Sequence, residues 1–412
     1  MKIVPDISFK GFEKEWKKKQ IGEIGYTYSG LTGKTKSDFG IGDCLYITFL
    51  NVLNNAIINS SILEKVNVCI DEKQNKVCKG DILFNTSSET PEEVGMCAAV
   101  DEELIDVYLN SFCFGLRITD KEIDSLFFAY LMRSDIGRNI MKFLAQGATR
   151  YNLSKNNFYK TKLLLPETKA EQYQIASYFR QLDIQISEQE KRIVKLKQLK
   201  SACLISMFPQ QGETVPRVRF KGFDGEWKNI KLKDILVERH EMSTITFLLP
   251  QLSFTISEGV IKPENRKTNK RDFLIKDKEN KKYIVTKIGD IIYNPANVVF
   301  GAIHRNNLCD GVVSPIYKIF YSEEDTKFVE CIVRNPAFIN KLTLYTEGTV
   351  TKLKTLKPES FLDMEVCITN DKAEQHQIAS YFRNLDIQIS EQEKRLEKLK
   401  QIKAACLDKM FV

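Results

Sequence analysis

The sequence predicts an α+β protein in which two mixed α/β domains are separated by two long helices that pair as an antiparallel coiled coil. The first observation is a tandem duplication: the forty residues at 169–208 recur at 372–411 with only eight differences. The second is the content of the segments between these copies, where short apolar runs alternate with Gly, Asn and Asp. We therefore expect domains at 1–168 and 209–371 and helices at 169–208 and 372–412, related by a pseudo-two-fold axis.

Each domain opens with the same short motif. Phe-Lys-Gly-Phe followed by Glu-Trp begins at Phe9 in the first half and at Phe220 in the second. Trp16 and Trp227, the only tryptophans of the chain, both belong to this motif. Its repetition indicates a structural anchor that holds each domain against a shared element.

Short runs of β-branched and aromatic residues between the motif and the long helix predict strands. The runs lie at 44–52, 80–88 and 111–119 in the first half, and at 283–295 and 312–320 in the second. Gly-Asp-Ile occurs at the same place in both halves, beginning at Gly80 and Gly289. One helical pattern follows the strands of each half, at 126–144 and 328–344. Each half is therefore mixed α and β.

The duplicated segment carries an apolar stripe whose spacing alternates between four and three residues, which is typical of a coiled-coil seam. Neither copy contains Pro or Gly, and so narrow a stripe needs a second helix to cover it. The nearest candidate is the other copy, in antiparallel orientation. The seam residues that we expect are Ile175, Phe179, Leu182, Ile186, Ile193, Leu196, Ile378, Phe382, Leu385, Ile389, Leu396 and Leu399.

Composition excludes several classes of protein. The hydrophobic fraction of 43% and charged fraction of 28% are typical of a globular protein, and no apolar run is long enough to span a membrane. The opening residues lack signal-peptide features, so we expect a cytoplasmic protein. Ten scattered cysteines and three histidines at unrelated positions predict neither a disulfide framework nor a metal site. A net charge of +7 permits an anionic partner.

Fragments that imitate catalytic motifs lack essential parts. Gly30-Leu-Thr-Gly-Lys-Thr35 has two residues between its glycines, whereas a phosphate-binding loop needs four. Asn335-Pro-Ala-Phe and Asn294-Pro-Ala resemble an amino-methyltransferase motif without its second proline, and no glycine-rich cofactor turn precedes either one. We therefore predict no catalytic residues and no metal ligands in this chain.

The order of the duplicated motifs resembles the specificity subunit of type I restriction-modification systems, HsdS. The resemblance covers essentially the whole chain. It is carried by the Phe-Lys-Gly-Phe motifs, the turn 146–154 (QGATRYNLS) with its looser counterpart beginning at 347 (EGTVTKL), and the two KAEQ-x-QIASYF helices. Further marks are YSGLTGKT, GDILFN, GDIIYNP, GVVSPIY and GAIHR.

This resemblance implies a non-catalytic subunit with two target recognition domains, each reading one half of a bipartite, asymmetric sequence in double-stranded DNA. The helices would set the separation of the domains and dock two methyltransferase subunits, which an ATP-dependent motor and nuclease subunit would join. The chain itself would bind no cofactor. The partner subunits would use S-adenosylmethionine for adenine-N6 methylation, and ATP with Mg²⁺ for cleavage.

The residues that we expect to contact DNA are polar or basic and lie in loops, because such groups bind base edges and phosphates. In the first half they are Lys34, Thr35, Lys36, Asn85, Thr86, Ser87, Gln146, Thr149, Arg150 and Asn152. In the second half they are Asn294, Asn297, His304, Arg305, Thr349, Thr351 and Lys352.

Two other functions remain open on the sequence. The chain could be a DNA-binding or scaffolding protein that acts alone, in which case it would bind specific DNA tightly without a partner. It could also be a methyltransferase itself, which the missing cofactor motif disfavours and which cofactor binding by the isolated chain would support.

Overall fold

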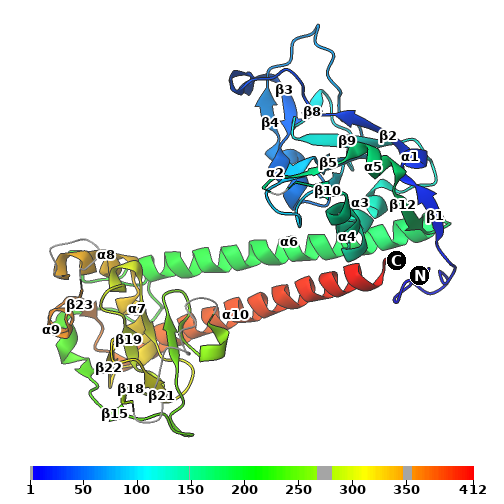
Figure 1. Cartoon of the computed structure of the whole chain (residues 1–412). Helices are drawn as coiled ribbons and strands as arrows, with labels where there is room; N and C mark the ends of the chain where they lie inside the picture. The colour runs from blue at the N-terminus through cyan, green and yellow to red at the C-terminus, as the bar shows by residue number, and fades with distance from the viewer. Residues whose placement is uncertain (1–2, 148, 267–280, 347–354) are drawn as a thin grey trace. The chain divides into compact units, whose positions relative to one another are not determined.

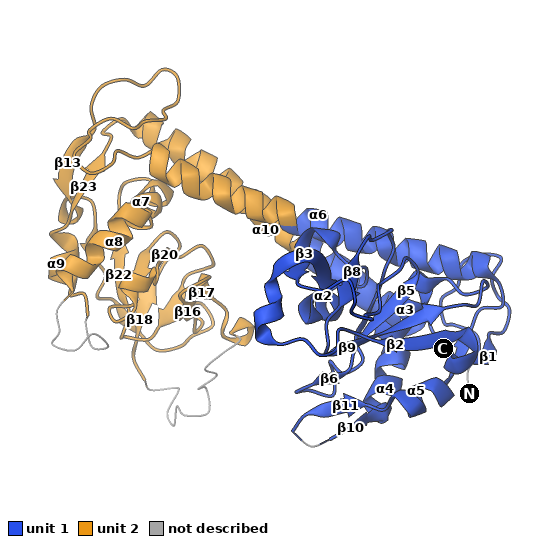
Figure 2. Cartoon of the chain, turned by 90° about the horizontal axis from the view of Figure 1, so that it is seen from above, with its two compact units in different colours: residues 1–190, 395–412 blue, residues 191–394 orange. Residues whose placement is uncertain are grey.

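The computed structural model describes residues 3–147, 149–266, 281–346 and 355–412 and contains two compact units (Figure 2). Unit 1 comprises Met1–Glu190 and Arg395–Val412, and unit 2 comprises Lys191–Lys394. The two long helices are α6 (Lys169–Ser206) and α10 (Lys372–Lys409), each of 38 residues (Figure 1). Each unit contains one mixed α/β region together with one end of each helix.

The helices pair antiparallel within both units, as the duplication predicts. Ion pairs join them at Lys403–Asp183 and Lys400–Glu190 in unit 1, and at Lys200–Asp386 and Lys197–Glu393 in unit 2. Residue numbers rise along one helix while they fall along the other, which defines the antiparallel direction. The two pairs of unit 2 are the duplicates of those in unit 1, so one set of contacts is used twice.

All twelve predicted seam residues are buried or half-buried in the structure. Buried members include Phe179 and Phe382, which have no exposed surface. Lys200 and Lys403, at polar positions of the same stripe, reach carboxylates of the opposite helix. The seam therefore combines apolar packing with charge pairs that specify register.

The described residues of unit 1 form four small sheets in its mixed region. The central one has the order β2-β9-β5-β7, and its strands are antiparallel neighbours. The others have the orders β4-β3-β8, β10-β11-β6 and β1-β12. The strands are β1 (Lys17–Gln20), β2 (Gly25–Ser29), β3 (Phe39–Ile47), β4 (Glu64–Val66), β5 (Asp81–Asn85), β6 (Ser87–Ser88), β7 (Cys97–Ala99), β8 (Val107–Leu109), β9 (Cys113–Ile118), β10 (Ala145–Gln146), β11 (Tyr151–Leu153) and β12 (Lys162–Leu165).

Unit 2 repeats part of this plan. Among its described residues, the central sheet has the order β14-β22-β19-β20, and three smaller sheets have the orders β13-β23, β15-β18-β21 and β16-β17. The strands are β13 (Lys228–Lys231), β14 (Val237–Glu238), β15 (Met242–Ser243), β16 (Ser253–Thr255), β17 (Gly259–Ile261), β18 (Tyr283–Thr286), β19 (Ile291–Tyr293), β20 (Ile303–Arg305), β21 (Gly311–Val313), β22 (Lys318–Tyr321) and β23 (Glu365–Ile368).

Shorter helices accompany the sheets. The α-helices are α1 (Ile21–Ile24), α2 (Phe49–Asn54), α3 (Ser125–Arg133), α4 (Asp135–Leu144), α5 (Lys155–Lys160), α7 (Thr326–Val333), α8 (Pro336–Tyr345) and α9 (Pro358–Leu362). The 3-10 helices are η1 (Lys36–Asp38), η2 (Ser60–Ile62), η3 (Leu232–Asp234), η4 (Pro263–Asn265) and η6 (Val298–Phe300).

The structure corrects the sequence expectations in three ways. The run 44–52 is a strand only to Ile47, because Thr48 caps α2 by accepting the N–H of Asn51. The helical pattern 126–144 is two helices, since the Ser134 side chain caps α4, and Pro336 likewise begins a new helix in unit 2. The run 283–295 is two strands with the Gly-Asp-Ile turn between them, and the runs 80–88 and 312–320 also contain two strands each, which belong to different sheets.

Equivalent aromatic stacks form the two cores. Phe84 lies parallel to Phe114 with 5.2 Å between ring centroids, and Tyr293 lies parallel to Phe320 at 5.8 Å. These residues belong to the central strands of the two units. The core therefore preserves its geometry although its residues differ.

The opening motif anchors each domain to the helices, as its repetition predicts. Trp16 packs edge-on against Phe411, which follows α10, and Trp227 packs edge-on against Phe208, which follows α6. Both tryptophans are almost completely buried. In each unit, one tryptophan thus holds the mixed region to the end of a long helix.

Candidate nucleic-acid interface

The Gly-Asp-Ile motif of unit 1 is a structural turn that leads into the central strand β5. Gly80 has a φ of +87°, which favours glycine, and the Asp81 carboxylate accepts the N–H of Cys78 at 2.9 Å. Arg117 of β9 donates two further hydrogen bonds to Asp81, at 2.9 and 2.7 Å. The turn therefore fixes the strand whose far end carries Asn85.

The same turn occurs in unit 2, where the arginine that binds the aspartate directly follows strand β14. The Asp290 carboxylate accepts the N–H of Lys287 at 2.8 Å and two hydrogen bonds from Arg239 at 2.8 and 2.9 Å. Gly289 has a φ of +97°. The strand that follows delivers Asn294, which aligns with Asn85 of unit 1.

Two of the three predicted DNA-binding loops of unit 1 meet in the small sheet β10-β11-β6. Asn152 of β11 lies opposite Ser87 of β6 on one side and Gln146 of β10 on the other. Arg150 donates to the Ser87 hydroxyl oxygen from Nε at 3.2 Å and from Nη2 at 3.0 Å. Its guanidinium carbon also lies 5.5 Å from the ring centroid of Phe112.

We call Phe112, Gln146, Arg150 and Asn152 the β10–β11 surface. Ser87, predicted to contact DNA, is only 5% exposed and lies beneath Arg150. Gln146, Arg150 and Asn152 are exposed, as is Thr149 in the connecting turn, and 55% of Phe112 is exposed. Amide, guanidinium, hydroxyl and aromatic groups are those that bind base edges, phosphates and base faces. This surface is the strongest candidate interface in the described part of unit 1.

The structure buries Asn85, another predicted contact, inside the domain and leaves Thr86 half-buried. Asn85 has no exposed surface, and its Nδ2 donates to the carbonyl oxygen of Glu93 at 2.9 Å. The backbone of Thr86 donates to Phe112 and accepts from Leu153, both at 2.9 Å. Both residues therefore hold the β10–β11 surface from beneath rather than forming part of its face.

Lys34, Thr35 and Lys36 lie beside the turn 69–72 rather than in this sheet. Lys34 donates to the Glu72 carboxylate at 2.6 Å, and this bond lowers the pKa of Glu72 to about 2. Burial disfavours the charge of Lys34, but Glu72 outweighs that effect and raises the pKa of Lys34. The backbone N–H and the hydroxyl of Thr35 both donate to the Asp38 carboxylate, at 2.8 and 2.9 Å. Lys36 is exposed.

Two of the predicted residues of unit 2 line one cavity. Asn294 and Asn297 form part of the wall of a space of about 500 Å³ between the β16–β17 hairpin and the loop after β19. The Asn294 amide oxygen accepts the N–H of Ala296 at 3.1 Å. The structure therefore brings these two asparagines together, as their spacing in one loop suggests.

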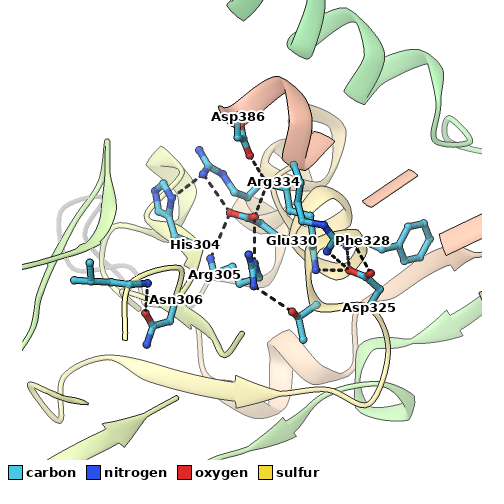
Figure 3. A network of polar contacts seen from close by, with 12 residues as sticks. His304, Arg305, Asn306, Asp325, Phe328, Glu330, Arg334 and Asp386 are labelled. Carbon is cyan, nitrogen blue, oxygen red and sulfur yellow. Dashed lines mark hydrogen bonds and ion pairs between the residues drawn. The ribbon is translucent and has the colours of Figure 1, made fainter. Parts of the chain in front are cut away.

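His304 and Arg305 lie in a buried polar network instead (Figure 3). The His304 imidazole is 3% exposed, with Nε2 2.7 Å from the carbonyl oxygen of Ile256 and Nδ1 2.7 Å from Nη1 of Arg334. Burial and the charge of Arg334 lower the pKa of His304 to about 4, so the ring is neutral near pH 7. Both ring nitrogens are engaged, and the imidazole offers no edge to DNA in this structure.

The same network extends from Arg305 to α10. Arg305 Nε lies 3.8 Å from the buried Glu330 carboxylate, which also accepts from Lys327 at 2.8 Å. Lys327 donates at 2.5 Å to Asp386 of α10, linking the interior of unit 2 to the paired helices. Thr349, Thr351 and Lys352 lie outside the described residues.

Several residues near these sites were not predicted. Phe112 lies under Arg150, and Phe254, Tyr317 and Arg266 line the cavity that contains Asn297. The basic run that begins at Arg266 could have indicated that arginine. Phe254 and Tyr317 carried no such signal, because buried aromatic side chains are common in and beside strands.

The described residues contain no group of three or more His, Cys, Asp or Glu side chains that could hold a metal ion. In the same part of the chain, none of the helices has the length and apolar character needed to cross a membrane.

Comparisons with known proteins agree with the fold described above. Residues 13–198 match the family model of the type I restriction modification DNA specificity domain. The S subunit of a type I restriction-modification system from M. genitalium is similar in structure, with a TM-score of 0.61, 14% identity and 99% of each chain covered. A chain from a structural study of complex assembly and conformational transition in a type I system has a TM-score of 0.53 and 15% identity, covering 96% of this chain and 97% of that one. Residues 13–198 thus belong to the type I restriction modification DNA specificity domain family, and the chain as a whole has the fold of type I specificity subunits.

Proposed function

We propose that this chain is the DNA-specificity subunit of a type I restriction-modification complex and recognises a bipartite, asymmetric target in double-stranded DNA. The observation that carries the proposal is the contrast between its repeats. The paired helices are nearly identical copies, whereas the polar surfaces beside them differ between the units. One scaffold with two different recognition surfaces suits a target with two different halves.

The exposed positions of the helices support docking of two copies of one partner. Packing within the chain constrains only buried positions, yet Ile184 and Glu188 recur unchanged as Ile387 and Glu391, and all four are exposed. The isoleucines are 42% and 55% exposed. A shared partner would cover an apolar residue on both exposed faces, and removing that apolar surface from water favours association. We propose that these partners are two methyltransferase subunits.

In this proposal the chain is not itself an enzyme and acts in the cytoplasm. It positions the methyltransferase subunits, which use S-adenosylmethionine, and a restriction subunit, which uses ATP and Mg²⁺. A stand-alone DNA-binding or scaffolding protein is the competing function, since the β10–β11 surface alone is compatible with either.

Methylome sequencing separates these functions. The chain is expressed with and without its neighbouring methyltransferase subunit in a host that lacks its own system. We expect N6-methyladenine at a two-part motif with a fixed gap, and only when both proteins are present. Expression of both proteins without any methylation would favour the stand-alone alternative.

A variant of the exposed helix face tests the docking step. Ile184→Glu with Ile387→Glu should abolish co-purification of the methyltransferase subunit while the chain keeps its thermal stability. The single variant Ile184→Glu should reduce the stoichiometry from two partner subunits to one. Retention of both partners by the double variant would contradict docking at these faces.

A further inference from the structure

The cavity of unit 2 has an aromatic floor. Phe254 and Tyr317 line it with 5.1 Å between their ring centroids and an angle of 47° between their planes. Both rings are at least nine-tenths buried, and Ala302 completes the floor. A volume of about 500 Å³ lies within the range of sites that hold a small organic molecule. The uncovered part of each ring gives the cavity an aromatic contact, and aromatic side chains favour planar heterocycles.

The polar side chains that line the cavity include three amides, the hydroxyls of Thr255 and Ser257 and the carboxylate of Glu258, and the amides belong to Asn265, Asn294 and Asn297. Among the described residues, neither Nδ2 of Asn294 nor the Asn297 amide has a hydrogen-bond partner, and Asn297 does not cap the η6 helix that follows it. A primary amide presents a donor beside an acceptor, the pattern that complements the edge of adenine. Arg266 lines the cavity and supplies a positive charge. Burial raises the pKa of the Tyr317 hydroxyl, and the charge of Arg266 offsets part of that increase.

One wall of the cavity is held from behind by the buried network. The carbonyl oxygen of Ile256, in the hairpin turn, bonds to His304, and His304 bonds to Arg334. Gly259 closes the turn with a φ of +70°, and a Cβ there would lie 2.7 Å from the His304 side chain. The wall therefore has a fixed position, because backbone, imidazole and guanidinium are in direct contact.

We propose that this cavity binds an adenine base that carries a 5′-phosphate, with the ring on Phe254 and Tyr317, the base edge on the asparagine amides and the phosphate at Arg266. The proposal deepens the proposed DNA-recognition function and rests on it for the source of the base. A base within a stacked duplex cannot enter a concave site, so the base would be one that leaves the stack. A free nucleotide presents the same chemistry.

The aligned position of unit 1 has a different role. Asn85 corresponds to Asn294, but its amide is buried and donates to Glu93. The following residues of unit 1 pair into the sheet β10-β11-β6 instead of leaving a cavity wall. We therefore expect the adenine site in unit 2 alone, and the β10–β11 surface of unit 1 to read DNA from outside.

The test is titration of deoxyadenosine monophosphate (dAMP) into the full-length chain by isothermal titration calorimetry. Asn297→Leu should raise its Kd at least tenfold, because the edge contact is lost while side-chain size is kept. Arg266→Gln should weaken dAMP but leave deoxyadenosine unchanged. Asn156→Leu, an exposed asparagine of α5 in unit 1, is the matched control and should bind as the unchanged chain does.

Absence of binding at about 10 mM dAMP, well above the Kd of a weak site, would overturn the proposal. So would equal affinity for deoxycytidine monophosphate, or an unchanged Kd in Asn297→Leu. Displacement of dAMP by the methylated target duplex would identify a DNA base as the source, and simultaneous binding would identify a free nucleotide. Methylation at a bipartite motif without dAMP binding would leave the proposed function intact and reject this site alone.

Discussion

Trp16 donates its indole N–H to the buried carboxylate of Glu171 at 3.0 Å. Burial raises the pKa of that carboxyl group. The equivalent carboxylate of unit 2, Glu374, instead accepts two hydrogen bonds from Arg219, at 2.6 and 2.8 Å. The buried indole nitrogen of Trp227 consequently has no partner within the described structure.

This difference predicts unequal effects of the same substitution. Trp16→Phe should lower the free energy of unfolding by about 1–3 kcal/mol more than Trp227→Phe does, because it leaves a buried carboxyl group without its donor. Both substitutions remove the same volume of the indole ring. The cost of the resulting cavity therefore cancels when the two variants are compared. Urea denaturation followed by circular dichroism measures the difference, and equal destabilisation would contradict the argument.

Gly259 and Gly301 form a second matched pair, with φ values of +70° and +83°. Gly301→Ala should cost about 1–2 kcal/mol of stability through backbone strain alone, since a Cβ there meets nothing within 4 Å. Gly259→Ala should cost about 1–3 kcal/mol more, because its Cβ would overlap His304. Thermal unfolding of the two variants compares these costs. A smaller loss for Gly259→Ala would show that the hairpin wall moves freely.

The buried imidazole of His304 should make the folded protein less stable in acid. Burial, then Arg334 and Lys200, lower its folded pKa to about 4 from the usual 6.5, with Ile256 and Glu330 opposing. The unfolded chain binds a proton at His304 below pH 6.5 whereas the folded chain does not, so stability is present above pH 6.5 and falls as the pH drops toward 4. The contribution is about 3 kcal/mol.

His304→Gln should flatten this part of the pH profile. The measurement is the change in unfolding free energy between pH 7 and pH 4.5 for each protein, rather than the absolute stability of the variant. An identical pH dependence in His304→Gln would show that the imidazole does not titrate as its surroundings imply.

The β10–β11 surface predicts two kinds of DNA-binding defect. Arg150→Ala should weaken binding to all duplexes and reduce the salt dependence by about one phosphate contact, whereas Asn152→Ala should relax one position of the target. Fluorescence anisotropy at several salt concentrations measures both. Lys191→Gln, which removes an exposed charge of α6, should leave the salt dependence unchanged. Loss of binding in that control would mean that net charge, not the surface, determines affinity.

The helices predict how the target gap is set. Four residues inserted after Arg192 and four after Arg395 should add about 6 Å to the helix pair, at 1.5 Å per residue. The unread gap should then lengthen by about one or two base pairs, at 3.4 Å each, while both half-sites stay the same. Methylome sequencing of the variant with its methyltransferase subunit reads the gap directly. An unchanged gap would contradict the helix pair as a spacer.

Duplication and periodicity, read from the sequence alone, were sufficient for the fold class, the two long helices and their seam. They were sufficient because a forty-residue repeat with a 3.5-residue stripe has few ways to bury that stripe. Local breaks were harder to predict. Ser134 divides a continuous helical pattern in two because its side chain bonds to the next turn, a choice that hydrophobic spacing does not record.

Only the tertiary structure decided which predicted DNA contacts stand together. Ser87 and Arg150 are 63 residues apart and meet because β6 and β11 pair. Asn85 and Asn294 align in sequence, yet one is sealed in the core of unit 1 and the other lines a cavity in unit 2. The exposure of each asparagine depends on how the loop after it packs. Because that loop packs against residues distant in the chain, alignment of the two repeats cannot predict the exposure.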